Sequence, residues 1–121
     1  MNTQTVVPQL RMTQAERSLA FYVGQLGFTI DWEHQFEPGL PLFVQLTREG
    51  QTIFLSGHAG DGQPGGAVYF WVPDADATYA AFVAKGVQPA KPIEDMPWGV
   101  REFLLVDPDH NQLRFGTELP D

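Results

Sequence analysis

Two halves of this sequence repeat one pattern of strands and helix. The first half predicts a strand over 6–11, a helix over 14–26 that ends at Gly27, and strands near 28–35, 42–47 and 52–56. The second half predicts a strand over 67–72, a helix over 75–85 that ends at Gly86, and strands near 87–93, 100–106 and 112–116. Each half is a βαβββ module, and a chain of this kind is α+β, with two modules forming a curved mixed sheet.

The repeat also sets the expected domain organisation. At 121 residues the chain is long enough for one domain and one modest core. Module 1 spans about residues 5–57 and module 2 about 66–117, with a glycine-rich linker at about 58–65. The linker is not a phosphate-binding loop, because no Gly-Lys-Ser/Thr follows it.

Both helices carry start and stop signals. Thr13 and Glu16 form a Thr-x-x-Glu capping box for the first helix, and Asp74 is the expected cap of the second. Gly27 and Gly86 supply the left-handed residue that ends each helix.

The strands alternate, which sorts their side chains into two faces. One face is apolar and should pack under the helices: Leu10, Ile53, Leu55, Val68, Phe70, Val72, Leu113 and Phe115. The other face mixes rings with polar groups, which is typical of a ligand groove or a subunit interface. Its residues are Val7, Gln9, Arg11, Thr52, Phe54, Ser56, Ala67, Tyr69, Trp71, Gln112 and Arg114.

Composition narrows the possible partners. The net charge of −8 disfavours nucleic acid and favours cationic ligands, although acidity alone often serves only solubility. The chain has no cysteine, no signal peptide and no apolar run long enough to span a membrane, so we expect a cytoplasmic location and no membrane partner.

Several segments together resemble the vicinal oxygen chelate superfamily, which holds glyoxalase I, extradiol dioxygenases, fosfomycin-resistance enzymes and bleomycin-resistance proteins. The resemblance covers nearly the whole chain. It rests on Pro8, on Phe21-Tyr22 with Leu26-Gly27-Phe28, on the run from Pro97 to Phe103, and on Asp107-Pro108-Asp109-His110-Asn111. It implies a glyoxalase/bleomycin-resistance-like fold.

In the metal enzymes that the chain resembles, His, Gln or Glu ligands come from the first and last strands of each module. The matching positions here are Val7, Phe54, Ala67 and Arg114. None of these side chains offers the oxygen or imidazole donor that a catalytic metal requires. We therefore expect no metal, no cofactor and no catalytic residues of the usual type.

Among metal-free members the bleomycin-resistance proteins look most similar. Asp31-Trp32, Tyr69, Trp71 and Trp98-Gly99 match that family, whereas His110 replaces its usual glycine and the loop over 33–39 does not match. The resemblance implies a homodimer in which the N-terminal strand crosses to the partner. Pro8 fits either that crossover or a plain edge strand.

The candidate ligand-binding residues follow from the mixed face and the resemblance. The rings would stack on a planar aromatic ligand and Asp31 would attract its positive charge, although plain core packing is the alternative for each ring. Arg114 either anchors a ligand oxygen or pairs internally with an acid such as Glu102. The set is Asp31, Trp32, Phe36, Phe54, Tyr69, Trp71, Trp98, Gly99 and Arg114.

Three functions remain open from sequence. The leading hypothesis is a metal-free protein that sequesters a small aromatic or cationic compound, such as a bleomycin-family antibiotic. The second is a glyoxalase-like lyase, isomerase or dioxygenase with an atypical site that uses His34 or His58. The third is a non-catalytic dimeric module whose groove is filled by its own side chains.

Overall fold

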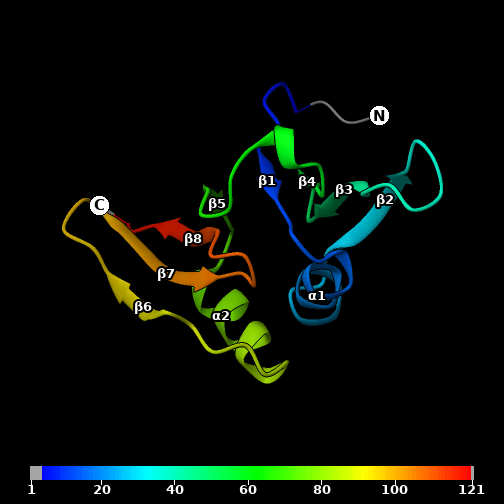
Figure 1. Ribbon diagram of the computed structural model, residues 1–121. Helices are drawn as coiled ribbons and strands as arrows, with labels where there is room; N and C mark the ends of the chain where they lie inside the picture. Colours follow the sequence, from blue (N-terminus) through cyan, green and yellow to red (C-terminus); the bar gives the residue numbers. More distant parts are fainter. Residues whose placement is uncertain (1–3, 121) are drawn as a thin grey trace.

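The computed structural model describes residues 4–120 and shows the repeat as two modules of the same topology (Figure 1). Module 1 contains β1 (Gln9–Arg11), α1 (Ala15–Leu19), the π-helical segment η1 (Ala20–Gln25), β2 (Thr29–His34), β3 (Phe43–Arg48) and β4 (Gln51–Ser56). A short 3-10 turn, η2 (Ala59–Asp61), lies in the connection. Module 2 contains β5 (Ala67–Trp71), α2 (Ala75–Ala84), β6 (Lys91–Asp95), β7 (Val100–Val106) and β8 (Gln112–Glu118).

Each module builds its own four-stranded mixed sheet. The strand orders are β1-β4-β3-β2 and β5-β8-β7-β6, and in each sheet the first strand is parallel to its neighbour while the others are antiparallel. The register places Gln9 opposite Phe54 and Tyr69 opposite Arg114. The α+β fold with two βαβββ modules is confirmed.

Three differences from the predicted elements have a clear physical reason. β1 is shorter than predicted because Pro8 has no N–H for the ladder, although its carbonyl still accepts a hydrogen bond from Phe54 N at 2.9 Å. The first helix has the predicted extent but widens into η1, where Leu26 N donates to Phe21 O. β6 begins at Lys91, after the buried Val87 has closed α2 by donating to Phe82 O.

Of the two predicted helix N-caps, one is confirmed and the other is wrong. Asp74 caps α2 as predicted, accepting a hydrogen bond from Ala77 N at 3.1 Å. The capping box predicted at Thr13 is wrong, because the N-cap is Gln14 without a side-chain cap, and the Thr13 hydroxyl donates to Asp109. Asp109 also accepts from Thr13 N at 3.0 Å, so a carboxylate from module 2 holds the start of α1.

The turn between β7 and β8 joins the modules through a set of buried polar contacts. Tyr22 donates its hydroxyl to Asp107 Oδ2 at 2.7 Å, and Asn111 Nδ2 donates to Arg11 O at 3.0 Å. Asp107 Oδ1 accepts from the backbone N–H groups of Asp109 and Asn111, which fixes the shape of the turn. The Asp-Pro-Asp segment is therefore a clamp between the two halves.

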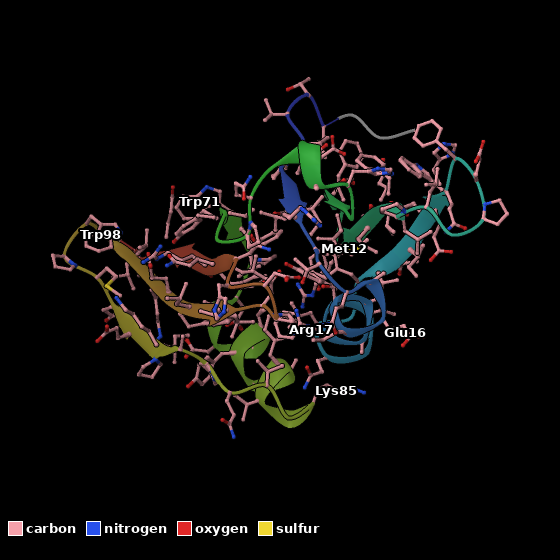
Figure 2. All side chains as sticks on the ribbon, viewed as in Figure 1. Met12, Glu16, Arg17, Trp71, Lys85 and Trp98 are labelled. Carbon is pink, nitrogen blue, oxygen red and sulfur yellow. The ribbon has the colours of Figure 1, made fainter. Side chains whose placement is uncertain are left out.

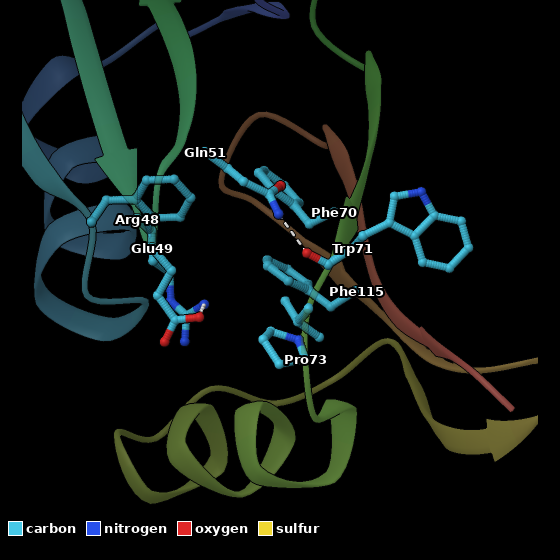
Figure 3. A pocket seen from close by; sticks show the side chains of 9 residues that line it. Arg48, Glu49, Gln51, Phe70, Trp71, Pro73 and Phe115 are labelled. Atoms are coloured by element: carbon cyan, nitrogen blue, oxygen red, sulfur yellow. Dashed lines mark hydrogen bonds and ion pairs between the residues drawn. The ribbon is translucent and has the colours of Figure 1, made fainter. Parts of the chain in front are cut away.

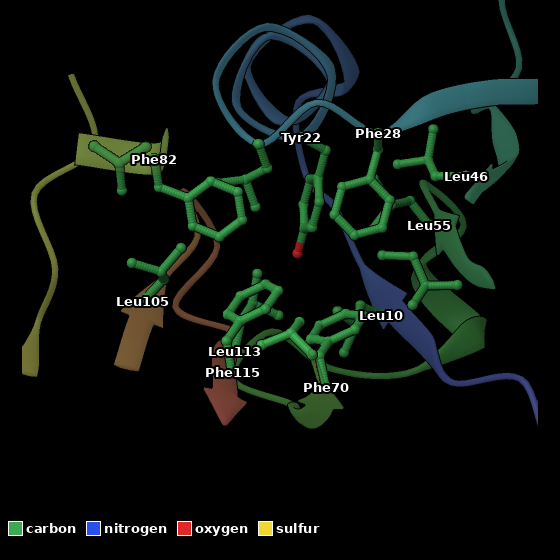
Figure 4. Close-up of a cluster of buried hydrophobic side chains, with 14 of the residues drawn as sticks. Leu10, Tyr22, Phe28, Leu46, Leu55, Phe70, Phe82, Leu105, Leu113 and Phe115 are labelled. Carbon is green, nitrogen blue, oxygen red and sulfur yellow. The ribbon is translucent and has the colours of Figure 1, made fainter. Parts of the chain in front are cut away.

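One hydrophobic cluster lies beneath both sheets and receives side chains from both modules (Figure 4). Phe28 of module 1 contacts Phe70 of module 2 edge-on, with ring centroids 6.0 Å apart. The apolar face predicted from alternation is confirmed: seven of its eight residues are buried, and Val68 packs against the same cluster. Because both helices cover this face, the opposite face of each sheet is left open.

Candidate functional site

The open face of module 1 carries a carboxylate next to an indole because β2 contains a bulge. Trp32 pairs with Gln45, and the register slips between Ile30 and Trp32. The slip lets Asp31 reach the same face as Trp32 instead of alternating to the other side. Asp31 Oδ2 accepts hydrogen bonds from Gln45 Nε2 at 2.9 Å and from Thr47 Oγ1 at 2.5 Å, so the carboxylate is held in place.

Three rings form a cluster beside Asp31. Trp32 and Phe43 are stacked with centroids 5.7 Å apart, and Phe54 lies 5.1 Å from Phe43 and 6.0 Å from Trp32. Trp32 is exposed and the two phenylalanines are partly exposed, so the cluster presents ring surface to solvent. A flat cationic group could stack there with its charge near Asp31.

The open face of module 2 is organised around a buried carboxylate. Glu102 has a side chain only 4% exposed; its Oε2 lies 3.2 Å from Arg114 Nε, and its Oε1 accepts from Tyr69 OH at 3.1 Å. Internal pairing of Arg114 with Glu102, one of the two accounts left open by the sequence, is therefore present. The remaining guanidinium N–H groups of Arg114 make no hydrogen bond within residues 4–120.

Glu102 also affects the pKa of its neighbour Tyr69. Partial burial first, and the negative charge of Glu102 second, raise the pKa of Tyr69 to about 12, while Arg114 acts in the opposite direction. Tyr69 thus stays protonated at neutral pH and remains a hydrogen-bond donor to Glu102. The Tyr69 hydroxyl occupies the space beside Gly116, where a Cβ would overlap it.

A cavity of about 410 Å³ opens beside this triad. Trp98 stands at its rim in the turn between β6 and β7, where it is 68% exposed, as Figure 2 shows at the outer edge of the molecule. Gly99 follows it at φ +91° and donates its N–H to Met96 O at 3.1 Å, so glycine is required to close this turn. The cavity is lined by Tyr69, Lys91, Glu94, Met96, Trp98, Glu102, Phe103, Leu104 and Arg114.

Trp71 lies at the seam between the modules and not in either of these groups. Its carbonyl accepts a hydrogen bond from the Gln51 side chain, and its indole points away from Phe70 and Phe115 (Figure 3). Cavities of about 320 Å³ and 310 Å³ flank this contact. Trp71 lines both of them and also contacts Tyr69, with ring centroids 4.9 Å apart.

The positions that match metal ligands in related enzymes are occupied by groups with other roles. Phe54 belongs to the ring cluster, Arg114 is paired with Glu102, and Val7 and Ala67 are aliphatic. Glu102, the nearest carboxylate to Arg114, has both oxygens engaged. Within residues 4–120 no three His, Cys, Asp or Glu side chains gather into a metal-binding set. A divalent ion does not fit this donor set.

The predicted site residues therefore divide into groups. Asp31, Trp32 and Phe54 lie together on module 1, whereas Tyr69, Trp98, Gly99 and Arg114 lie around the cavity of module 2. Phe36 lies with His34 at the outer end of module 1, and Trp71 lies at the seam.

Phe43 and Met96 belong to these faces but are absent from the predicted set. Strand alternation could have found Phe43, which shares its parity with Gln45 and Thr47. Met96 follows an irregular strand containing Pro92, where alternation gives no signal.

No helix of the described chain has the length and apolar character needed to cross a membrane.

Comparisons with known proteins agree with this architecture. The sequence model of glyoxalase superfamily proteins matches residues 1–120. No curated protein sequence matches the chain. A solved glyoxalase/bleomycin resistance protein/dioxygenase superfamily member from Sphaerobacter thermophilus is 29% identical, with a TM-score of 0.73 over 95% of this chain and 98% of that chain.

Two further solved structures share the fold at lower identity. A bleomycin resistance determinant encoded on the transposon Tn5 has a TM-score of 0.79 at 23% identity, covering 96% of this chain and 98% of that chain. TnmS3, an antibiotic binding protein from a Streptomyces species, has a TM-score of 0.73 at 20% identity, with the same two coverages.

Proposed function

The chain belongs to the glyoxalase superfamily, and we propose that within it the protein is a metal-free binding protein that sequesters a small aromatic or cationic compound, such as a bleomycin-family antibiotic. The observation that carries this proposal is the open face of module 1. There an anchored carboxylate, Asp31, lies beside the exposed ring of Trp32. Charge attraction and stacking need no bond to be made or broken in the ligand.

Module 2 supports the same proposal with complementary chemistry. Arg114 keeps guanidinium N–H groups available at the rim of a cavity, and Trp98 supplies a second exposed ring there. A ligand that carries a cationic group at one end and oxygen acceptors at the other would match both faces. The protein's net charge of −8 would also speed its encounter with a cationic ligand.

The proposal includes a homodimer as the binding unit. β1 and β5 are both edge strands, and the large exposed rings Trp32, Phe36, Tyr69, Trp71 and Trp98 lie outside the helix-covered faces. A second copy would cover part of this apolar surface and bring the module 1 face of one copy towards the module 2 face of the other. Light scattering during gel filtration would measure the mass of the particle. A 13.5 kDa monomer at micromolar concentration would contradict this part.

The binding function is tested by titrating bleomycin into the protein while heat and tryptophan fluorescence are followed. We expect saturable binding at micromolar ligand or below, weakened several-fold by Asp31→Asn and by Trp98→Ala. Glu37→Gln, which removes an exposed carboxylate from the neighbouring loop, is the charge-matched control. Binding that none of these site variants alters would contradict the proposed faces.

An enzyme with an atypical site is the second candidate, and one observation favours it. His34 and His58 line a common cavity with Asp61 on module 1. Elemental analysis of gently purified protein separates the two functions. Stoichiometric Ni, Mn, Fe or Zn would favour the enzyme and overturn the metal-free proposal.

A further inference from the structure

The cavity of about 320 Å³ at the seam lies between the turn that joins β3 to β4 and the end of β5 (Figure 3). We call it the seam cavity. Its apolar wall includes Phe28, Phe70 and Phe115, which belong to the hydrophobic cluster under the helices and to neither open face. Trp71 and Pro73, which also line it, are exposed. The seam cavity is therefore separate from both candidate binding faces, and its volume suits a small ligand.

Arg48 brings a positive charge to this apolar surrounding. Its side chain is only 14% exposed. Nε donates to Leu26 O at 3.1 Å, and the guanidinium carbon lies 5.0 Å from the centroid of the Phe82 ring. Both of these partners are neutral, so they hold the guanidinium in place without cancelling its charge. A mostly buried charge of this kind calls for a counter-ion.

The counter-ion within the described chain is loosely held. Among residues 4–120, Glu49 is the one carboxylate within ion-pair distance of Arg48, and its Oε2 lies 3.5 Å from Nη1. Charge-assisted hydrogen bonds are shorter, about 2.7–2.9 Å. The Glu49 side chain is also 60% exposed, so water competes for its carboxylate. A ligand carboxylate with better geometry could therefore take its place.

The Nη groups of Arg48 are accessible to such a ligand. Neither of them makes a hydrogen bond to another of residues 4–120, and neither is a buried unpaired atom, because His58 Nε2 alone has that status in this part of the chain. Figure 3 shows Arg48 and Glu49 together on the module 1 side of the seam cavity, with Pro73 across the space from them.

The backbone fixes Glu49 beside Arg48. Arg48 pairs with Gln51 across the hairpin, so Glu49 and Gly50 form a two-residue turn. Their φ angles are +47° and +80°, the left-handed values that such a turn requires. The turn thus presents an exchangeable carboxylate at the edge of the seam cavity.

We propose that the seam cavity binds a small carboxylate with an aromatic or branched apolar body. The ligand carboxylate replaces Glu49 at the Nη groups of Arg48, and the apolar body lies against the ring wall and Pro73. This ligand class is opposite in charge to the compound proposed for the face of Asp31. The seam cavity is accordingly a second binding site, beyond the sequestering function.

The probes are benzoate and benzamide, which have nearly the same shape and differ in charge. Protein with ¹⁵N-labelled arginine is titrated with each compound while the side-chain signals are followed by NMR. We expect benzoate to shift the Arg48 Nε signal saturably and to bind about 10-fold more tightly than benzamide, the value of a hydrogen bond to a charged group. Equal affinities, or shifts at Arg114 without shifts at Arg48, would overturn the proposal.

Charge variants give the sharper test. Glu49→Gln removes the competing carboxylate and should strengthen benzoate binding about 2- to 5-fold, the range of an exposed ion pair. Arg48→Gln should abolish the preference for benzoate. If Arg48→Gln folds poorly, Glu49→Gln still decides the matter, because its side chain is exposed.

Glu37→Gln is the matched control, because it removes the same charge from the exposed loop at the opposite end of β3. It should leave the affinity for benzoate unchanged. Equal gains in Glu37→Gln and Glu49→Gln would mean that only net charge matters, and would contradict the site.

The outcome is independent of the bleomycin titration. If bleomycin binds while benzoate leaves Arg48 unaffected, the seam site alone is wrong. If benzoate binds at Arg48 while bleomycin does not bind, the seam site stands and the proposed antibiotic ligand is wrong.

Discussion

Arg114 Nε lies 3.2 Å from Glu102 Oε2, and this diagonal pair on neighbouring strands β7 and β8 occupies the open face of module 2. In the metal enzymes that the sequence resembles, a ligand stands at the position of Arg114. Here a cation stands there and neutralises the buried carboxylate next to it. The face is consequently suited to hydrogen bonding with a ligand and unsuited to a divalent ion.

Removing the positive charge of Arg114 should destabilise the protein, because the Glu102 carboxylate is buried. Arg114→Met leaves Glu102 without its counter-charge, and we expect the free energy of unfolding to fall by about 1–3 kcal/mol, less than for a fully buried pair because Arg114 is partly exposed. Glu102→Leu/Arg114→Met should recover much of the loss. Urea unfolding of the unmodified protein, the two single variants Arg114→Met and Glu102→Leu, and the double variant completes the cycle. Additive single effects in this cycle would mean that the two side chains do not interact.

Gly116 should be intolerant of a side chain because Tyr69 fills its space. Gly116→Ala should lower the free energy of unfolding by about 1–3 kcal/mol through overpacking. Shortening the tyrosine in Gly116→Ala/Tyr69→Val should relieve the overlap. Gly24→Ala is the matched control, because a Cβ there meets nothing within 4 Å and should stabilise the helix by about 0.5–1 kcal/mol. Similar losses at both glycines would refute the packing argument.

The Tyr69 hydroxyl should titrate late and in response to Glu102. Its pKa in the folded protein, about 12, lies above that of an unfolded tyrosine, so its contribution to stability is complete below pH 10 and is lost as the pH rises towards 12. Glu102→Gln should lower the Tyr69 pKa part of the way towards 10. NMR of ¹³C-labelled tyrosine follows the residue directly. A pKa near 10 in the unmodified protein would contradict the hydrogen bond to Glu102.

Asp109 should make the protein sensitive to acid. Burial acts to raise the pKa of this carboxyl, but hydrogen bonds from Thr13 and the charge of Arg17 outweigh it and lower the pKa. The sign of the shift means that the stabilisation is present above the pKa of an unfolded aspartate, about 4, and is lost as the pH falls through the folded value.

We expect Asp109→Asn to lose about 1–3 kcal/mol at pH 7 and to show a flatter decline in stability below pH 4. Thermal unfolding followed across pH 2–7 provides the measurement. Glu16→Gln, which changes an exposed carboxyl on α1, the helix that Asp109 contacts, controls for net charge. Parallel curves for Asp109→Asn and the unmodified protein would exclude the clamp as a source of acid sensitivity.

The fold could be predicted from sequence because the two modules repeat and their strands alternate cleanly. The two glycines predicted to end the helices adopt the expected left-handed conformation, with Gly27 at φ +82° and Gly86 at φ +91°. His110 stands at φ +64°, which explains in backbone terms why the related turn usually carries glycine there. Sequence signals of this kind predict the local structure wherever the backbone conformation depends on a single residue.

The parts that could not be predicted depend on contacts between distant segments. Thr13 has a cap-like sequence context, yet its partner is Asp109 from the other module, and only the folded chain brings them together. Asp31 reaches the ring face through a bulge that strict alternation does not reveal. In both cases contacts between different segments of the chain override a local sequence pattern.

The most direct measurement is a titration with bleomycin of protein that has been dialysed against a chelator and is kept in chelator throughout. Binding is monitored by tryptophan fluorescence. We expect the same affinity and stoichiometry as for untreated protein, with weaker binding in Arg114→Met and Trp98→Ala. Loss of binding or of any turnover on chelation, restored by adding a divalent metal, would contradict it.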